Sequence, residues 1–245
     1  MKTSIATLLC SCVLAAGAAH AETLLVGTDA GLAPFEFKDP KTEQIVGFDI
    51  DIIKAVAKAV GDEAKIQNMQ FAGIIPALQT NMIDVAIAAI TITDERKKQV
   101  LFSDPYYDVG LAMVIEAENE SKYKTLEDVE GKAICAQIGS TGSLLAQSVK
   151  GAKVMNFDQV AEAIMELKMG GCAAALLGDT TARHYQKIHN DKEILVVPHL
   201  YNPKQVGIAT AKKNTALIEK INKGLAAIKA SGEYDRIYQK WLGHE

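Results

Sequence analysis

Residues 85–107, VAIAAITITDERKKQVLFSDPYY, decide the fold, because a buried strand and the start of a helix meet within them. The uninterrupted apolar run over 85–90 predicts a fully buried strand. Thr93 predicts the N-cap of a helix, and the two acidic residues after it stand where the helix dipole favours negative charge. Thr91 and Arg96 therefore stand where strand and helix meet. A hydroxyl, free backbone amides and a guanidinium suit a carboxylate there, although an ordinary solvated first turn explains these residues equally well.

Strands and helices alternate along the rest of the chain, and one order of elements occurs twice. The first half is expected to hold strands over 24–28, 66–69 and 110–115, an amphipathic helix over 48–60 and a helix from 74. The second half is expected to hold strands over 133–138, 154–157, 173–177, 194–197 and 206–210, and helices from 144, 159, 181, 214 and 233. This repetition predicts an α/β protein of two similar lobes with mainly parallel sheets, each in three layers.

The chain must then cross between the lobes near residues 108–114 and again near 203–207. We expect the first lobe to comprise residues 22–109 and 206–245, and the second to comprise residues 110–205. Phe71 is expected in a loop, and Pro76 in the first turn of the helix after it, where a missing N–H costs nothing. Asp49 and Asp51, in the first turn of the helix over 48–60, are expected to interact with the helix dipole.

Residues 1–21 have the form of a signal peptide. Lys2 is followed by an apolar stretch that is too short to span a membrane and by the small-x-small sequence Ala19-His20-Ala21. We expect cleavage after Ala21 and a periplasmic protein. A lipoprotein with Cys12 as the acceptor is the alternative, but Leu9-Cys10-Ser11-Cys12 is a poor lipobox.

Charge argues against a nucleic-acid partner. The chain has 26 lysines and arginines against 30 aspartates and glutamates, and it has no basic patch interleaved with aromatic residues. Cys135 and Cys172 remain in the mature chain. We expect two buried thiols, with a disulfide as the alternative in an oxidising compartment. The pair has no neighbouring ligand and does not predict a zinc site.

Three further sites have the chemistry of ligand contacts. Asp29 follows the first predicted strand, at the edge where open α/β sheets bind ligands, although turn formation or helix capping explains an aspartate there as well. Asp179 also lies just past a predicted strand. Residues 139–143, GSTGS, open a helix after a strand. This turn lacks the lysine of a phosphate-binding loop, so it predicts only free amides and hydroxyls that hold a small anion.

Together these stretches resemble a known family. The matching motifs are Asp29-x4-Pro-Phe-Glu-Phe, Gly47-Phe-Asp-Ile-Asp, Phe71-x-Gly-Ile-Ile-Pro-Ala-Leu, Ile90-Thr-Ile-Thr-Asp-Glu-Arg, Phe102-Ser-Asp-Pro-Tyr-Tyr, Gly139-Ser-Thr-Gly and Tyr238-x-x-Trp. They span the mature chain in order. The sequence resembles the extracellular solute-binding proteins of amino-acid ABC importers, family 3, and is most similar to glutamine-binding and arginine/lysine-binding members.

The resemblance implies two lobes joined by a two-strand hinge that close over one free amino acid. It also implies a monomer that needs no cofactor or metal, is not an enzyme, and delivers its ligand to an inner-membrane ABC permease. By resemblance, Arg96 pairs with the ligand α-carboxylate, and Asp179 with the α-ammonium group. The other expected ligand-binding residues are Asp29, Leu32, Phe71, Ala89, Thr91, Gln137 and Thr141.

These other residues differ in what they are expected to contact. Thr91 and Thr141 add bonds to the zwitterion from opposite lobes. Asp29 and Gln137 face the ligand side chain, and Phe71 packs against its aliphatic part. Leu32 stands where many relatives have an aromatic residue, and Ala89 stands where serine or glycine is common.

Asp29 favours a ligand side chain that donates hydrogen bonds or carries positive charge, such as that of arginine, lysine or glutamine. Two alternatives remain open from the sequence. One is a dehydratase-like enzyme on the same fold, and the other is a binder of another small organic anion.

Overall fold

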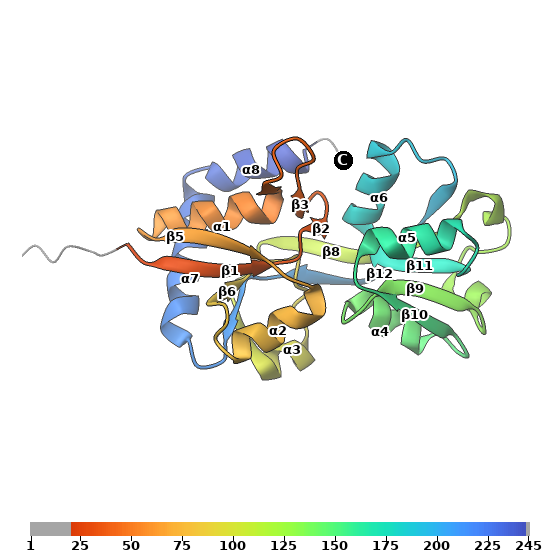
Figure 1. The fold of residues 1–245 in the computed structure, drawn as a ribbon, viewed down its shortest axis with the longest axis horizontal. Helices are drawn as coiled ribbons and strands as arrows, with labels where there is room; N and C mark the ends of the chain where they lie inside the picture. The colour runs from red at the N-terminus through yellow and green to blue at the C-terminus, as the bar shows by residue number, and fades with distance from the viewer. Residues whose placement is uncertain (1–20, 244–245) are drawn as a thin grey trace, which may run out of the picture.

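Two lobes lie side by side along the long axis of the molecule (Figure 1), in a computed structural model that describes residues 21–243. The first lobe contains a sheet of order β5-β1-β6-β13-β7. Its strands are β1 (Thr23–Thr28), β5 (Glu63–Asn68), β6 (Val85–Ala86), β7 (Val100–Phe102) and β13 (Ala209–Ala211). Strand β13 runs antiparallel to both neighbours, so the other four strands share one direction.

The second lobe repeats this arrangement with the order β10-β9-β11-β8-β12. Its strands are β8 (Tyr107–Glu116), β9 (Ala133–Gln137), β10 (Lys153–Phe157), β11 (Ala174–Gly178) and β12 (Ile194–Val206). Here β8 is the antiparallel strand. The prediction of an α/β fold with two similar, mainly parallel sheets is therefore confirmed.

Helices cover both faces of each sheet, which gives each lobe three layers. In the first lobe α1 (Phe48–Ala59), α7 (Thr215–Ala230) and α8 (Glu233–Trp241) pack on one face, and α2 (Phe71–Gln79) packs on the other, beside the short α3 (Asp94–Gln99). In the second lobe α5 (Val160–Lys168) and α6 (Asp179–Ile188) pack on one face, and α4 (Thr141–Ser148) on the other. Two 3-10 turns, η1 (Ala117–Asn119) and η2 (Leu126–Val129), follow β8.

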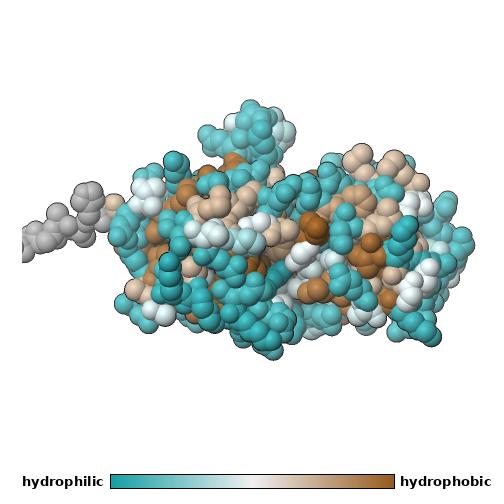
Figure 2. Space-filling model, turned by 60° about the horizontal axis from the view of Figure 1, so that its bottom comes forward, coloured by the Kyte–Doolittle hydropathy of each residue, from teal (hydrophilic) through white to brown (hydrophobic). Residues whose placement is uncertain are grey.

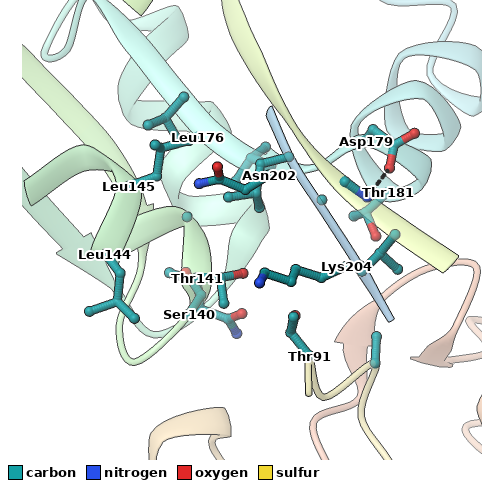
Figure 3. Close-up of a pocket in the computed structure, with 18 of the residues that line it drawn as sticks. Thr91, Ser140, Thr141, Leu144, Leu145, Leu176, Asp179, Thr181, Asn202 and Lys204 are labelled. Atoms are coloured by element: carbon teal, nitrogen blue, oxygen red, sulfur yellow. Dashed lines mark hydrogen bonds between the residues drawn. The ribbon is translucent and has the colours of Figure 1, made fainter. Parts of the chain in front are cut away.

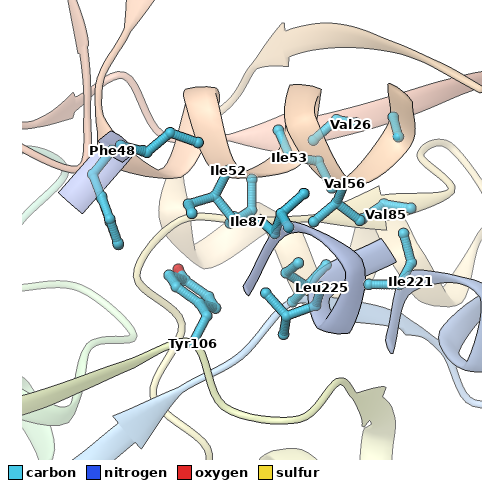
Figure 4. Close-up of a cluster of buried hydrophobic side chains, with 14 of the residues drawn as sticks. Val26, Phe48, Ile52, Ile53, Val56, Val85, Ile87, Tyr106, Ile221 and Leu225 are labelled. Carbon is cyan, nitrogen blue, oxygen red and sulfur yellow. The ribbon is translucent and has the colours of Figure 1, made fainter. Parts of the chain in front are cut away.

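The core of the first lobe forms because α1 is amphipathic. Phe48, Ile52 and Val56 recur at helical spacing and are fully buried. Figure 4 shows Ile52 and Val56 near Ile221 and Leu225 of α7, and Phe48 pointing toward Tyr106, within one buried cluster. Each such side chain contributes about 1.5–3 kcal/mol on burial. Gly61, in the left-handed conformation, follows the end of α1.

Strands β8 and β12 join the lobes. They pair from Tyr107 with Val206 to Glu116 with Ile194, and Val206 also bridges to Thr91 of the first lobe. The strand predicted over 194–197 therefore continues to Val206, and the strand predicted over 206–210 overlaps the end of β12 and β13. Its pairing shifts register twice, and the second shift falls between Tyr201 and Lys204.

Local details differ from prediction where tertiary contacts override the sequence pattern. Phe71 is the first residue of α2 and not part of a loop, so Pro76 lies inside the helix and not in its first turn. Within the run over 85–90 only Val85–Ala86 is a strand, and Ala89 turns the chain with a φ of 42°. Strand β7 and a small sheet of β2 (Gly31–Leu32), β3 (Glu36–Lys38) and β4 (Ile45–Val46) have too few residues to produce a pattern.

The expectation of two free thiols is wrong, because Cys135 and Cys172 form a disulfide with their Cα atoms 5.9 Å apart. Cys135 lies on β9, and Cys172 stands two residues before its neighbour β11. The bond therefore ties β9 to the residues that lead into the neighbouring strand β11.

Three predictions about the N-terminus, namely the signal peptide, its cleavage after Ala21 and the lipoprotein alternative at Cys12, rest on residues 1–20, outside the described part of the chain. Within residues 21–243, no helix has the length and apolar character needed to cross a membrane. The same residues contain no group of three or more histidine, cysteine or acidic side chains that could hold a metal ion.

Candidate functional site

A cavity of about 330 Å³ lies between the lobes, a volume in the range of small-molecule sites. Figure 2 shows hydrophobic residues on both lobes beside the hollow that separates them. Eight of the nine predicted ligand-binding residues line the cavity: Leu32, Phe71, Ala89, Thr91, Arg96, Gln137, Thr141 and Asp179. The structure therefore brings together side chains from both lobes that lie far apart in the sequence.

Arg96 is the main cation of the first-lobe wall. The Thr93 hydroxyl caps α3 by accepting from the Arg96 backbone N–H, as predicted. The guanidinium donates to the Thr91 carbonyl at 2.9 Å and, across the cleft, to the Gly139 carbonyl at 3.0 Å, and it lies 5.3 Å from the centre of the Phe71 ring. Burial lowers the pKa of Arg96 to about 10, so it is charged at neutral pH.

The second-lobe wall provides helix N-termini and one carboxylate. Thr141 begins α4, whose first turn is held by the Ser140 hydroxyl accepting from the Ser143 N–H. A Cβ atom on Gly142 would lie 2.2 Å from the Leu176 carbonyl, so only glycine lets this helix end approach β11 so closely. Asp179 begins α6, and one of its oxygens accepts from the Gly110 N–H at 3.1 Å (Figure 3).

Asp29, the ninth predicted residue, is not part of the cavity wall. Its carboxylate accepts from the Gln137 and Gln159 amides of the second lobe at 2.8 and 3.0 Å and from the Phe71 N–H at 3.2 Å. Burial raises the pKa of Asp29, and these three hydrogen bonds oppose the shift. Asp29 therefore joins the two lobes behind the cavity. The lobes are close enough here that a Cβ atom on Gly31 would lie 1.8 Å from the Gln159 side chain.

Apolar side chains make up much of the remaining wall. Phe71 forms part of it from the first lobe, and Leu32 packs against the cores of both lobes. Leu144, Leu145 and Leu176 contribute from the second lobe, where Figure 3 shows them grouped together. This wall suits the aliphatic part of a small ligand.

A buried acid pair supports the cavity from behind. Asp49 is fully buried and accepts from the Ala89 N–H and from the Tyr106 hydroxyl, both at 2.7 Å. The hydrogen bond from the Ala89 N–H to Asp49 holds Ala89 in its left-handed conformation on the cavity wall. Asp49 is therefore more than a partner of the α1 dipole, because it positions a segment that lines the site.

Glu36, also fully buried, is the other acid of this pair. Neither of its oxygens, nor Oδ1 of Asp49, meets a hydrogen-bond donor within the described chain. The two side chains interact directly, because a proton held on Glu36 can be donated to the Asp49 carboxylate. Burial and then the Asp49 charge raise the pKa of Glu36 well above its ordinary value, and burial raises that of Asp49 to about 6.

Sequence reasoning missed two residues of the hinge strand β12. Asn202 and Lys204 line the cavity, although this stretch was predicted only as a crossing between lobes. The Asn-Pro dipeptide at 202–203 is the signal that could have indicated an irregular strand.

One family of known proteins matches nearly the whole described chain. Its sequence model, described as bacterial extracellular solute-binding proteins, family 3, matches residues 24–244. The chain belongs to this family. An ABC transporter glutamine-binding protein of Bacillus subtilis is 37% identical over 89% of this chain and 79% of its own length, and ABC transporter arginine-binding protein 1 of Escherichia coli is 34% identical over 98% of both chains.

Solved structures are similar over almost the same range. An ancestral arginine-binding protein bound to arginine has a TM-score of 0.86 and 45% sequence identity, covering 90% of this chain and 98% of its own. The family membership and the two-lobed fold inferred from the motifs are thus confirmed.

Proposed function

We propose that this protein is the substrate-binding component of an ABC importer. It captures a free polar amino acid between its lobes in the periplasm and delivers it, as a monomer, to an inner-membrane permease. The observation that carries the proposal is that Arg96 of the first lobe and Asp179 of the second line the same cavity. Relatives named for arginine and glutamine binding support the same class of ligand.

An amino acid is a zwitterion, and this cavity has a group for each of its charges. Arg96 pairs with the α-carboxylate, aided by Thr91 and by the N–H groups of the first turn of α4 at Thr141. Asp179 accepts from the α-ammonium group. Each charge-assisted hydrogen bond contributes about 1.5–3 kcal/mol, so four or five of them can give the roughly 8 kcal/mol of micromolar binding.

Hinge closure follows from the origin of these groups. Because Arg96 and Asp179 belong to different lobes, a ligand meets both only when the lobes come together. We place the lobe boundaries at residues 22–109 with 206–245 and at 110–205, so that β8 and β12 carry the motion. Binding without reaction fits this arrangement, since a guanidinium paired with carbonyls and threonine hydroxyls holds charge and moves no proton.

A thermal-shift screen against the common amino acids and their deaminated analogues tests the proposal. A ligand that binds only the folded protein at 100 times its Kd adds about 2.7 kcal/mol to the free energy of unfolding. We expect a clear rise in Tm with at least one polar amino acid and a much smaller rise with its deaminated analogue. Equal shifts with both compounds would favour a binder of organic anions, and turnover of any compound would favour an enzyme.

A further inference from the structure

Lys204 is a cation of the cavity that the zwitterion does not use. Two cationic side chains, Arg96 and Lys204, line the cavity, but Asp179 is the acidic side chain in its wall. The α-carboxylate neutralises Arg96, and the α-ammonium group neutralises Asp179. One positive charge, that of Lys204, is then left to face the rest of the ligand.

The position of Lys204 is set by an irregularity in the hinge. Between Tyr201 and Lys204 the pairing of β12 with β8 shifts register, and Asn202 takes a left-handed conformation with a φ of 47°. Bulges of this kind redirect side chains and are common beside functional sites. Figure 3 shows the outcome, in which the Lys204 side chain crosses the cavity and its ammonium group points toward Ser140 and Thr141.

The surroundings of this ammonium group favour an acceptor. Within residues 21–243, Lys204 has no ion pair and no hydrogen bond from its ammonium group. It points toward the start of α4, whose N–H groups are assigned above to the α-carboxylate. The ammonium group of Lys204 itself therefore favours a carboxylate or carbonyl oxygen on the rest of the ligand, and it repels a cationic group there.

Asp29, the residue expected to attract a cationic side chain, is occupied by other partners. It accepts from Gln137, Gln159 and the Phe71 N–H, and it does not line the cavity. A guanidinium or ammonium group of a ligand would have to displace these donors to reach it.

We propose that Lys204 determines specificity, so that the protein binds an amino acid whose side chain ends in a carboxylate or carboxamide more tightly than one whose side chain ends in a cation. The inference rests on the proposed function and names its substrate class. Glutamate and glutamine are ligands of this kind among the common amino acids, and arginine and lysine are the disfavoured ones.

Isothermal titration with glutamate, glutamine, arginine and lysine tests this inference in the wild type, Lys204→Met and Lys153→Met. Lys153 is an exposed lysine of β10 that does not line the cavity, so its variant is a control for the same loss of charge. In wild type we expect glutamate or glutamine to bind more tightly than arginine and lysine. Lys204→Met should weaken glutamate binding by about 10-fold or more, the ratio given by one charge-assisted hydrogen bond, and should not weaken arginine binding.

The outcomes separate the two proposals. Tighter binding of arginine or lysine than of glutamate and glutamine by wild type would overturn the role of Lys204 while leaving amino-acid capture intact. So would a Lys204→Met variant whose affinities change no more than those of Lys153→Met. Absence of binding to every free amino acid would overturn both proposals. Because Lys204 is exposed, the Tm of each unliganded variant should equal that of wild type, which shows that folding is unaffected.

Discussion

Replacing Glu36 by glutamine should remove a proton-linked part of the stability. Glu36 is buried against Asp49, and burial together with the Asp49 charge raises the pKa of Glu36 well above its ordinary value of 4.5. The unfolded chain releases this proton near that value. Above it the folded protein binds about one proton more than the unfolded chain, so the free energy of unfolding falls as the pH rises. Glutamine keeps the size of the side chain and donates an N–H to Asp49 at every pH.

The size of the effect follows from proton linkage. One proton bound only by the folded state changes the free energy of unfolding by about 1.4 kcal/mol for each pH unit. For each pH unit over which the folded protein keeps a proton that the unfolded chain has released, the wild type should therefore lose about 1.4 kcal/mol relative to Glu36→Gln. For a chain of this size, each such loss corresponds to roughly 3–6 °C in Tm. The same argument gives Asp49, with its pKa raised to about 6, a loss of stability in the same direction as the pH rises through that value.

Differential scanning calorimetry of the two proteins from pH 4.5 to 8 measures the difference directly. Glu219→Gln, which alters an exposed glutamate of α7, is the control and should follow wild type at each pH. Parallel Tm curves for wild type and Glu36→Gln would mean that Glu36 is ionised in the folded protein, and the shared-proton arrangement behind Ala89 would then be wrong.

Three further changes have defined outcomes. Arg96→Ala should weaken amino-acid binding at least about 100-fold, because two charge-assisted hydrogen bonds are lost; titration measures this, and wild-type affinity would remove Arg96 from the site. Asp179→Asn should weaken the binding of an amino acid by about 10-fold or more, but the binding of its deaminated analogue much less. Equal losses of affinity for both ligands in a competition assay would mean that Asp179 does not bind the α-ammonium group. Replacing Cys135 and Cys172 together by alanine should cost about 4 kcal/mol in urea unfolding, since the disulfide closes a loop spanning 37 residues; an unchanged midpoint would contradict this.

The parts of the site that sequence could predict are those that depend on local pattern. Thr91 and Arg96 stand at a junction of strand and helix that the neighbouring residues define, and Thr141 and Asp179 open helices directly after strands. Because parallel strands end at one edge of a sheet, the order of residues along the chain makes these positions candidate ligand contacts, and the resemblance to the family assigns their roles. All four residues line the cavity.

The parts that could not be predicted depend on partners distant in the chain. The sequence around Asp29 does not reveal that its carboxylate accepts hydrogen bonds from Gln137 and Gln159, which are 108 and 130 residues away. Lys204 enters the cavity only because β12 shifts register against β8, and that shift is a property of the paired strands. Cys135 and Cys172 are joined because β9 and β11 are neighbours, which spacing alone does not reveal.

Hydrogen bonds between the lobes have a consequence for transport. Arg96 to Gly139, Gln137 and Gln159 to Asp29, and Gln70 to Asp158 at 2.8 Å all join protein groups directly, so part of the free energy that brings the lobes together does not come from the guest. These bonds reduce the part of the closing free energy that the ligand must supply. The apparent affinity for the ligand rises in proportion to the fraction of protein that is already in the binding-competent conformation. The same bonds also favour closed protein without ligand, which would compete with the ligand-bound form for the transporter. Stronger bonds between the lobes therefore favour capture at low ligand concentration, and weaker bonds favour rapid delivery.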